Sequence, residues 1–402
     1  MRMLTLKPLL ALTTIMLGFV FVIPSGRAQT YTVLYNFTGG SDGASPQGTL
    51  IIDSGANLYG TTRYGGDLTC LGEGAGCGVV FKLDPFGTET VLHTFEDLND
   101  GQYPAAGLTL GAGGSLFGTT LSGGTGNGGG DGTVFKLDPS GHETVLFAFN
   151  ANTDFVGGAS PVGNVVLDPA GNIYGATAGG GNDGKCQPSG CGVIYKLNPV
   201  GGEDVLHIFT GEGNDGSQPG AGPVRDSLGR LYFTTTHSAL IGPGAAFRLT
   251  PHGELSVLEF PSGAGKPSRP VGPTFDAAGN AYIPMLAGGS GNAGGIDKVS
   301  PTGKLVGFAS CDGTNCSGPN TGMAFDAAGN LYGTSQVSAG GAGNVFKLDT
   351  AGHLTAIHNF SSQDGGGYYP LAGLVKDSAG NLYGTTSKGG AFNYGVVFKI
   401  TP

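Results

Sequence analysis

Short hydrophobic segments recur along the chain after about residue 30, and their patterns fall into four types. Segments this short, rich in β-branched and aromatic side chains and bounded by turn residues, predict strands rather than helices. The first type ends in aromatic-Gly-Thr-Thr and stands at 58–62, 116–120, 173–177, 231–235, 281–285, 331–335 and 382–386. The second type reads apolar-aromatic-basic-apolar and stands at 80–83, 134–137, 194–197, 246–249, 296–299, 345–348 and 397–400.

Two further types complete a four-strand unit. The third type reads Val-Leu-x-x-Phe and stands at 33–37, 91–95, 145–149 and 205–209, with weaker copies around Phe260, Phe308 and Phe360. The fourth type runs from a proline through an apolar stretch to an aspartate, as at 46–53, 161–168, 319–326 and 370–377; proline is tolerated where a strand begins. Short Asp-x-x-Gly-Asn and Asp-Pro-x-Gly turns between the segments join antiparallel neighbours.

The unit repeats every 50 to 58 residues, which favours propeller blades over a solenoid or a sandwich. The chain opens with a lone third-type strand at 33–37 and stops after 396–400, a strand that lacks its outer neighbour. The N-terminal strand can complete the last blade, which closes the ring and removes a free sheet edge. We expect one all-β domain over residues 29–402, a seven-bladed β-propeller with four antiparallel strands per blade.

The first 28 residues have the pattern of a signal peptide. Arg2 and Lys7 precede an apolar run at 9–23, and small residues stand at Gly26 and Ala28. The run is short for a membrane span, and no later apolar segment reaches the roughly 18 residues that a span needs. We therefore expect cleavage after residue 28, no membrane span in the mature chain, and a secreted, periplasmic or cell-surface protein. An uncleaved N-terminal anchor is the alternative.

Composition narrows the class of partner. The chain holds 80 glycines and 23 prolines, and only 12% of its residues are charged. The leader carries three basic and no acidic residues, so the formal charge moves from -10 to -13 when it is removed (-10 - 3 = -13). A nucleic-acid partner would need a basic stripe, and the sequence has none. We expect a monomer.

Six cysteines in an exported chain indicate disulfides rather than a metal site. Fifteen pairings are possible in principle. Local pairing is the simplest, because the cysteines form three close sequence pairs, each in a different repeat: Cys70 with Cys77, Cys186 with Cys191, and Cys311 with Cys316.

The recurring Gly-Asn-Leu-Tyr-Gly-Thr-Thr, Gly-Gly, Val-Phe-Lys-Leu and Asp-Gly-x-x-Pro motifs resemble the bacterial GloVer (Gloeo/Verruco) extracellular tandem-repeat family. The resemblance covers residues 31 to 402 and implies a surface or secreted repeat protein, with no catalytic residue to carry over. Blades four and five depart most from the pattern, at Phe233, Pro284 and Asp297.

Strand polarity puts the two short turns of every blade on one face of the disc and the long connections on the other. We call these the short-turn face and the long-loop face. Binding residues concentrate on long loops that a rigid scaffold holds. Acidic residues recur there, and a ring of them round a channel mouth could bind calcium or cationic groups: Asp42, Asp100, Asp215, Asp312 and Asp364. The alternative is that each Asp-Gly pair is a simple turn. No cofactor is predicted, and calcium stays open.

Other candidates occur in one copy only, as a binding or catalytic residue of a repeat protein would. The loop that enters blade five has Lys266 and Arg269 and no aspartate, which suits an anionic ligand or reflects drift. His237, which we expect in a long loop, is the best candidate for a general acid or base, with Arg225 as its basic neighbour. Four tyrosines near these loops could stack on sugar rings: Tyr64, Tyr103, Tyr368 and Tyr369.

Two classes of function follow. The sequence lacks His-Glu-x-x-His and Gly-x-Ser-x-Gly motifs and a phosphate-binding loop, which favours a binding or scaffold propeller for an extracellular polysaccharide or surface protein. The alternative is an extracellular lyase or lactone hydrolase with a metal-assisted site at the channel mouth, and fold analogy supplies most of that case. The enzyme would require several of the loop aspartates to converge beside His237 or Arg225.

Overall fold

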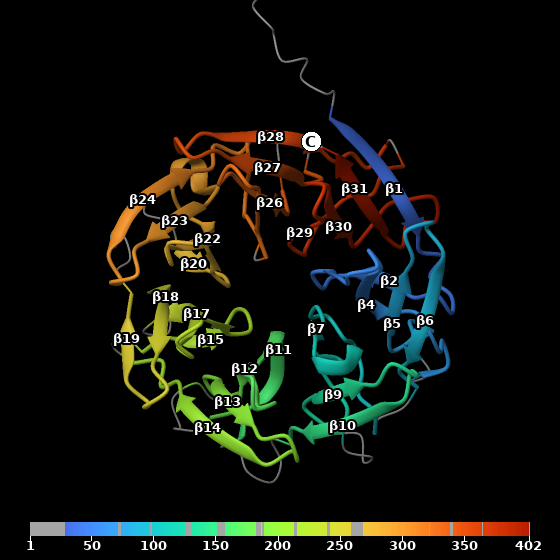
Figure 1. The fold of residues 1–402 in the computed structure, drawn as a ribbon, viewed down its shortest axis with the longest axis horizontal. Helices are drawn as coiled ribbons and strands as arrows, with labels where there is room; N and C mark the ends of the chain where they lie inside the picture. Colours follow the sequence, from blue (N-terminus) through green and yellow to red (C-terminus); the bar gives the residue numbers. More distant parts are fainter. Residues whose placement is uncertain are drawn as a thin grey trace, which may run out of the picture.

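Seven antiparallel sheets stand round a central axis and form a β-propeller (Figure 1). The computed structural model describes residues 29–401 except 71–73, 97–98, 125–129, 151–156, 182–185, 187–188, 213–214, 239–241, 259–267, 321, 338–340 and 364. In each sheet the strands follow one another from the axis to the rim in sequence order, apart from the last blade. The predicted fold class is therefore confirmed.

The strands of each blade are given from the axis outwards. Blade 1 has β2 (Ala44–Pro46), β3 (Ile51–Ile52), β4 (Leu58–Tyr64), β5 (Val79–Leu83) and β6 (Glu89–Thr94). Blade 2 has β7 (Thr109–Leu110), β8 (Leu116–Thr120), β9 (Thr133–Leu137) and β10 (Glu143–Ala148), and blade 3 has β11 (Ala159–Leu167), β12 (Ile173–Gly179), β13 (Val193–Leu197) and β14 (Glu203–Ile208). Blade 4 has β15 (Ser217–Pro219), β16 (Val224–Arg225), β17 (Leu231–Ser238), β18 (Gly242–Leu249) and β19 (Leu255–Val257).

The remaining blades repeat this order. Blade 5 has β20 (Ser268–Pro270), β21 (Thr274–Phe275), β22 (Ala281–Ala287), β23 (Gly295–Val299) and β24 (Leu305–Ser310), and blade 6 has β25 (Ala324–Phe325), β26 (Leu331–Ser335), β27 (Asn344–Leu348) and β28 (Leu354–Asn359). Blade 7 has β29 (Val375–Lys376), β30 (Leu382–Thr386), β31 (Val396–Thr401) and, outermost, β1 (Thr30–Asn36). Two 3-10 turns lie at Ala112–Gly114 and Ser290–Asn292.

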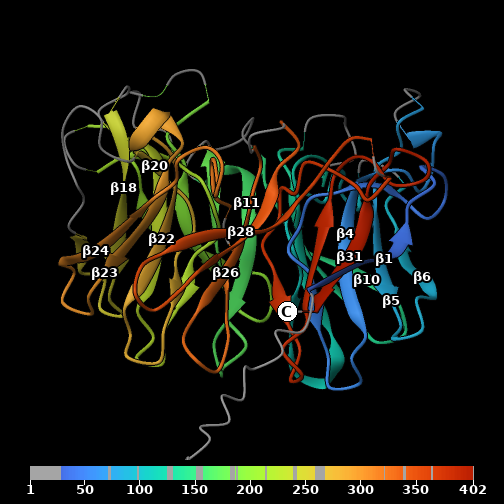
Figure 2. The same ribbon diagram turned by 90° about the horizontal axis from the view of Figure 1, so that it is seen from above.

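The N-terminal strand closes the ring. β1 pairs antiparallel with β31, so that Thr30 lies opposite Thr401 and Asn36 opposite Val396. The two ends of the chain therefore share one sheet, as the sequence predicts (Figure 1). Seen from the side, the strands run between the long-loop face, at the top, and the short-turn face, at the bottom (Figure 2).

The aromatic-Gly-Thr-Thr pattern has a separate structural reason at each position. A Cβ on Gly60 would lie 2.7 Å from the ring of Phe81, so only glycine leaves room for that ring. The hydroxyl of Thr61 donates to the carbonyl of Ala106 in the next blade at 2.7 Å. The hydroxyl of Thr62 accepts from the amide of Val79 at 3.2 Å. The pattern thus joins strands within a blade and blades to each other.

Rings of the third-type strands pack against the next blade. Phe37, on leaving β1, meets Phe81 of blade 1 edge-on, with 5.1 Å between ring centroids and 70° between ring planes. The same edge-on contact recurs as Phe95 with Phe135, Phe149 with Tyr195, Phe209 with Phe247 and Phe360 with Phe398. Burying one such ring contributes about 1.5–3 kcal/mol, so these contacts are the main apolar joints between blades.

The Asp-x-x-Gly-Asn turns are closed by one carboxylate each. Asp53 accepts from the amides of Gly55 and Asn57, from the side-chain amide of Asn57, and from the hydroxyl of Tyr59. Lys82 of the third strand lies over the Tyr59 ring, 6.0 Å from its centroid. The network recurs in other blades, so the basic residue that every third strand carries belongs to the architecture.

All three expected disulfides are present: Cys70–Cys77, Cys186–Cys191 and Cys311–Cys316. In the part of the chain that the structure describes, no helix is long and apolar enough to cross a membrane. The expected leader, residues 1–28, lies outside the described residues.

Candidate functional site

Asp42 and Asp215 hold the loops that leave the outermost strands. Asp42 accepts from the amide of Thr38 at 2.7 Å and from the hydroxyl of Tyr35 in β1 at 3.0 Å, and it is 9% exposed. Asp215 lies 2.7 Å from Nε2 of His207 in β14. Burial raises the pKa of Asp215, but the hydrogen bonds that it accepts outweigh this and hold the pKa below its ordinary value. Both carboxylates are bonded to outer-strand side chains, away from the axis.

Of the other predicted acidic residues, one also lies beside an outer strand, one lies in a disulfide-closed turn, and one lies outside the described residues. Asp100 accepts from an amide of its own loop at 3.2 Å and lies 3.5 Å from Nε2 of His93 in β6. Asp312 closes the small turn between Cys311 and Cys316, where it accepts from the amide and hydroxyl of Thr314, both at 2.7 Å. Asp364 lies outside the described residues.

The described aspartates therefore do not form the expected acidic ring at the channel mouth. Three of them are at the outer strands, because each accepts from a threonine or glutamate amide at the end of that strand and lies beside a ring on it. Within the described ranges, no group of three or more His, Cys, Asp and Glu side chains is placed to hold a metal ion. Calcium binding, which the sequence leaves open, gains no supporting cluster among the described residues.

The two catalytic candidates lie at opposite ends of one strand. His237 is within β17, not in a loop as expected, and pairs with Ser217 and Pro243; its Nδ1 lies 3.0 Å from the hydroxyl of Thr236. Arg225 pairs with Leu231 at the other end of β17. Six residues separate these pairs along the strand, about 20 Å at roughly 3.3 Å per residue. The structure does not bring His237 and Arg225 together.

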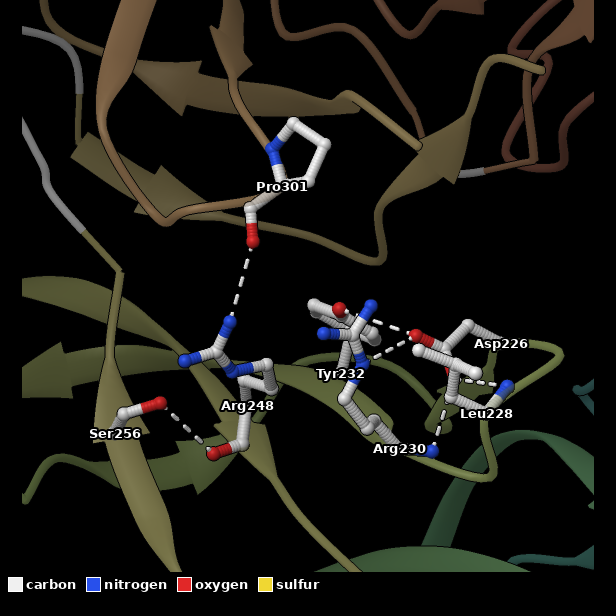
Figure 3. A network of polar contacts seen from close by, with 7 residues as sticks. All are labelled: Asp226, Leu228, Arg230, Tyr232, Arg248, Ser256 and Pro301. Carbon is white, nitrogen blue, oxygen red and sulfur yellow. Dashed lines mark hydrogen bonds and ion pairs between the residues drawn. The ribbon is translucent and has the colours of Figure 1, made fainter. Parts of the chain in front are cut away.

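Beside Arg225, blade 4 has a network of its own on the short-turn face (Figure 3). Arg230 replaces the asparagine of the other turns and donates from Nε to Asp226 at 2.6 Å, while the hydroxyl of Tyr232 donates to the same oxygen at 3.2 Å. Arg248 donates across to the carbonyl of Pro301 in blade 5 at 3.2 Å. These contacts close a turn and join two blades, which is a structural role.

A cavity of about 240 Å³ lies on the axis. Residues from the inner strands of blades 1, 2, 3, 4 and 7 line it, and none of these described residues is ionisable. Five of the lining residues directly follow the proline of an inner strand: Gln47, Ala105, Val162, Gly220 and Leu371. The residue before each of those prolines therefore lies where its inner strand enters the channel from the long-loop face.

That residue before the proline has an unusual backbone. It has a positive φ of 53° to 59° in six blades, although it is not glycine: Ser45, Tyr103, Ser160, Gln218, Arg269 and Tyr369. In blade 6 the position is Gly318, with φ 61°. Left-handed backbone costs an L-residue roughly 1–2 kcal/mol, and a following proline ordinarily favours an extended residue. We call these seven residues the mouth ring.

Contacts between blades hold the mouth ring in this conformation. The amide of Tyr103 donates to the carbonyl of Cys77 in blade 1 at 2.9 Å, and the amide of Ser160 donates to the backbone carbonyl of Asp131 in blade 2 at 2.7 Å. The proline that follows packs on the preceding blade, since a Cβ on Gly78 would lie 2.7 Å from Cδ of Pro104. We call this amide–carbonyl bond and the proline contact the backbone clamp. The clamp is the same in successive blades, while the side chain of the mouth-ring residue changes.

Two aromatic clusters with a cation each stand beside the mouth ring. In blades 1 and 2, the Arg63 guanidinium lies 5.3 Å from the ring centroid of Tyr64, and Tyr64 meets Tyr103 edge-on at 5.6 Å. The second cluster is in blade 7, where Nζ of Lys388 lies 5.5 Å from the centroid of Tyr369, and Tyr369 is 5.2 Å from Tyr368. The four tyrosines are half-buried.

The Gloeobacter/Verrucomicrobia repeat matches this chain twice, over residues 17–239 and 218–402. The chain belongs to this repeat family. In this chain the proline of the inner strand recurs in all seven blades, whereas the mouth-ring residue before it differs between copies. No curated protein matches the chain by sequence.

Solved structures with the same fold are distant in sequence. A streptogramin B lyase aligns with a TM-score of 0.61 at 14% identity, over 93% of this chain and 97% of that chain. A virginiamycin B lyase from Staphylococcus aureus aligns with a TM-score of 0.60 at 14% identity, over 93% of this chain and 99% of that chain. The extracellular domain of a hybrid two-component system from B. thetaiotaomicron gives 0.57 at 12% identity, over 93% of this chain and 41% of that chain. At such identities the likeness shows the fold alone.

Sequence reasoning found part of this site for other reasons. Tyr103 and Tyr369 were candidates for sugar stacking, and Arg269 for an anionic ligand, whereas Lys266 lies outside the described residues. Ser45, Ser160 and Gln218 were missed. The available signal was their place before the recurring proline, with a different residue in most copies.

Proposed function

We propose that this member of the repeat family is an exported binding propeller that holds an extracellular saccharide at the channel mouth of its long-loop face. One observation carries the proposal: the mouth ring keeps a strained backbone constant while its side chains vary. Export rests on the signal-peptide pattern at 1–28 and on three disulfides, which persist in oxidising compartments.

The strain argues for a role of the side chains. Glycine adopts positive φ without the steric penalty, and Gly318 shows that the clamp accepts it in blade 6. A chain with 80 glycines nevertheless keeps a side chain at this position in six blades. Backbone strain of this kind clusters at ligand clamps and active sites. The side chains are therefore retained at a cost in stability, which a ligand contact explains.

The chemistry of the ring suits a saccharide. Two tyrosines offer flat apolar faces for the C–H face of a sugar ring, and Ser45, Ser160 and Gln218 offer hydrogen-bonding groups for hydroxyls. Binding sites combine an apolar surface with a few polar groups that fix orientation. The ring stands over a cavity whose described lining is uncharged, so a neutral sugar residue can approach the axis without meeting a buried charge.

No specific contact favours the enzyme alternative. A lyase or lactone hydrolase would need carboxylates beside His237 or Arg225, and Asp42, Asp100 and Asp215 are bonded within loops at the outer strands. The likeness to streptogramin B lyase is a likeness of fold. We therefore do not propose a reaction.

The test is a binding screen of the chain from residue 29 to 402 against neutral and acidic oligosaccharides, read by thermal shift and then calorimetry. A ligand at about a hundred times its dissociation constant adds roughly 2.7 kcal/mol to the free energy of unfolding. Phe86→Ala is the control, because Phe86 is a 93% exposed aromatic residue in a short-turn-face loop. We expect a saccharide to bind both proteins equally. If no saccharide binds, and an extracellular protein does, the proposal is wrong.

A further inference from the structure

Arg63 and Lys388 are cations that the fold itself does not use. The structure gives neither of them an ion pair with a described residue. Nε of Arg63 is buried and has no hydrogen-bond partner among the described residues. Leaving a buried donor unsatisfied costs about 1–3 kcal/mol, and more when the group is charged. Part of the hydrogen-bonding capacity of this guanidinium is therefore unused by the described fold.

The other copies of the repeat show that neither cation belongs to the architecture. The residue that follows Gly-Thr-Thr or its equivalent is arginine only in blade 1; the other six blades have Leu121, Ala178, Thr236, Leu286, Gln336 and Ser387. The next position is lysine only in blade 7, and tyrosine, serine, glycine, histidine, alanine or valine in the other copies. Leu121 lines the axial cavity, which puts the Arg63 position on the channel side of its blade.

Elsewhere in the molecule, three described cations form ion pairs with aspartates. Arg230 pairs with Asp226 at 2.6 Å, Lys298 with Asp276 at 3.7 Å, and Lys196 with Asp204 at 3.9 Å, all on the short-turn face or its outer edge. The described carboxylate nearest to Arg63 in sequence, Asp67, accepts from the amide and hydroxyl of Thr69, and Asp42 is bonded to the outer strand. The protein is acidic, with a formal charge of -10, yet the mouth at blades 7, 1 and 2 presents two cations without carboxylate partners.

The two cations sit on the same tyrosines that would carry the sugar. Arg63 lies over the ring of Tyr64, which touches Tyr103, and Lys388 lies over the ring of Tyr369. A guanidinium binds carboxylate or sulfate through two parallel N–H groups, which an ammonium cannot do. An anionic group on a sugar that packs on Tyr103 or Tyr369 would therefore meet a cation held next to it.

We propose that the saccharide bound at the channel mouth is anionic, bearing a carboxylate or a sulfate that Arg63 receives and Lys388 attracts. The inference rests on the proposed function and narrows its ligand class. Arg63 supplies the directed contact, and Lys388, a point charge on a flexible stem, supplies the longer-range attraction. Both contributions decrease as salt screens the charges.

The experiment measures dissociation constants by calorimetry for four ligands: hexagalacturonate, its methyl ester, a sulfated malto-oligosaccharide and the unsulfated parent. The methyl ester keeps the sugar and removes the charge. Comparing the sulfated oligosaccharide with its unsulfated parent shows whether the site binds a sulfate rather than a carboxylate. We expect one charged ligand to bind at least tenfold more tightly than its neutral counterpart. We also expect Arg63→Gln to reduce that preference about tenfold, and Lys388→Gln to reduce it less.

Lys304→Gln is the matched control, because it removes the same charge from an exposed turn of the short-turn face. Melting curves of every variant check folding, and Gln336 shows that the fold accepts glutamine at the Arg63 position. If charged and neutral ligands bind alike, or if Lys304→Gln weakens binding as much as Arg63→Gln, the inference is wrong while saccharide binding stands. If no saccharide of either kind binds, the proposed function fails with it.

Discussion

The ring of Phe37 meets the ring of Phe81 edge-on at 5.1 Å, and both side chains are fully buried. Phe37 follows the N-terminal strand and Phe81 lies in the first complete blade, so this contact joins the closing strand to the blade next to it. Ring closure therefore uses the same aromatic joint that connects other neighbouring blades.

Truncating this joint should open the ring. Phe37→Ala removes a fully buried ring and leaves a cavity, so we expect a loss of about 3–5 kcal/mol in the free energy of unfolding by urea. Phe86→Ala deletes a ring that is 93% exposed and should stay within about 0.5 kcal/mol of the parent. Equal effects of the two substitutions would contradict the account of closure.

Stability should rise as the pH falls from about 7 towards 4.5. The pKa of Glu89, Glu143 and Glu203 is raised from 4.5 to about 7. Burial is the largest cause and a nearby aspartate contributes in each case, although the charge of His93 opposes this at Glu143. A carboxyl whose pKa is higher in the folded state binds its proton more tightly there. The stabilisation is therefore complete below pH 4.5 and is lost as the pH rises through 7.

The variant Glu143→Gln should remove its share of this pH dependence and raise the melting temperature at pH 8 by roughly one to three degrees. Glu254→Gln is the control, since Glu254 is exposed in the corresponding turn of blade 4.

Below about pH 4 the turn aspartates change the stability in the opposite direction. Although burial raises the pKa of Asp53, the hydrogen bonds that it accepts hold that pKa below 3.8, so its contribution is lost only as the pH falls through the lowered value. A melting temperature that falls steadily from pH 8 to pH 5 would refute this assignment.

At the mouth ring, glycine should be more stabilising than alanine. In an ordinary strand glycine is about 0.5–1 kcal/mol worse than alanine. At Ser160, with φ 53°, alanine keeps the steric cost and glycine removes it. We expect Ser160→Gly to be at least as stable as the parent and more stable than Ser160→Ala by about 1 kcal/mol in urea titrations. The usual order, with alanine better, would show that the backbone there is not strained.

The repeats themselves made most of the fold predictable. The seven copies of each segment predicted the strands, and the unpaired segment at 33–37 predicted how the ring closes. The short spacings between cysteines predicted the three disulfides. The basic residue of each third strand recurs in every copy, which by itself indicates an architectural role.

The geometry of the site was harder to predict for physical reasons. The direction of the Asp42 carboxylate is decided by Thr38 and Tyr35, which donate to it from the outer strand, and the Asp-Gly pattern contains no information about that choice. His237 was expected in a long loop, whereas β17 continues to Ser238. The mouth ring was hidden because a residue before proline is expected to be extended.

The most direct test of the account is one variant measured twice. Tyr103→Gly with Tyr369→Gly removes two side chains of the mouth ring and leaves the backbone clamp free of strain. We predict that its free energy of unfolding equals or exceeds that of the parent, while its affinity for the saccharide found in the screen falls at least a hundredfold, as expected when two aromatic anchors are lost. A double variant that binds the saccharide as tightly as the parent would contradict the central claim.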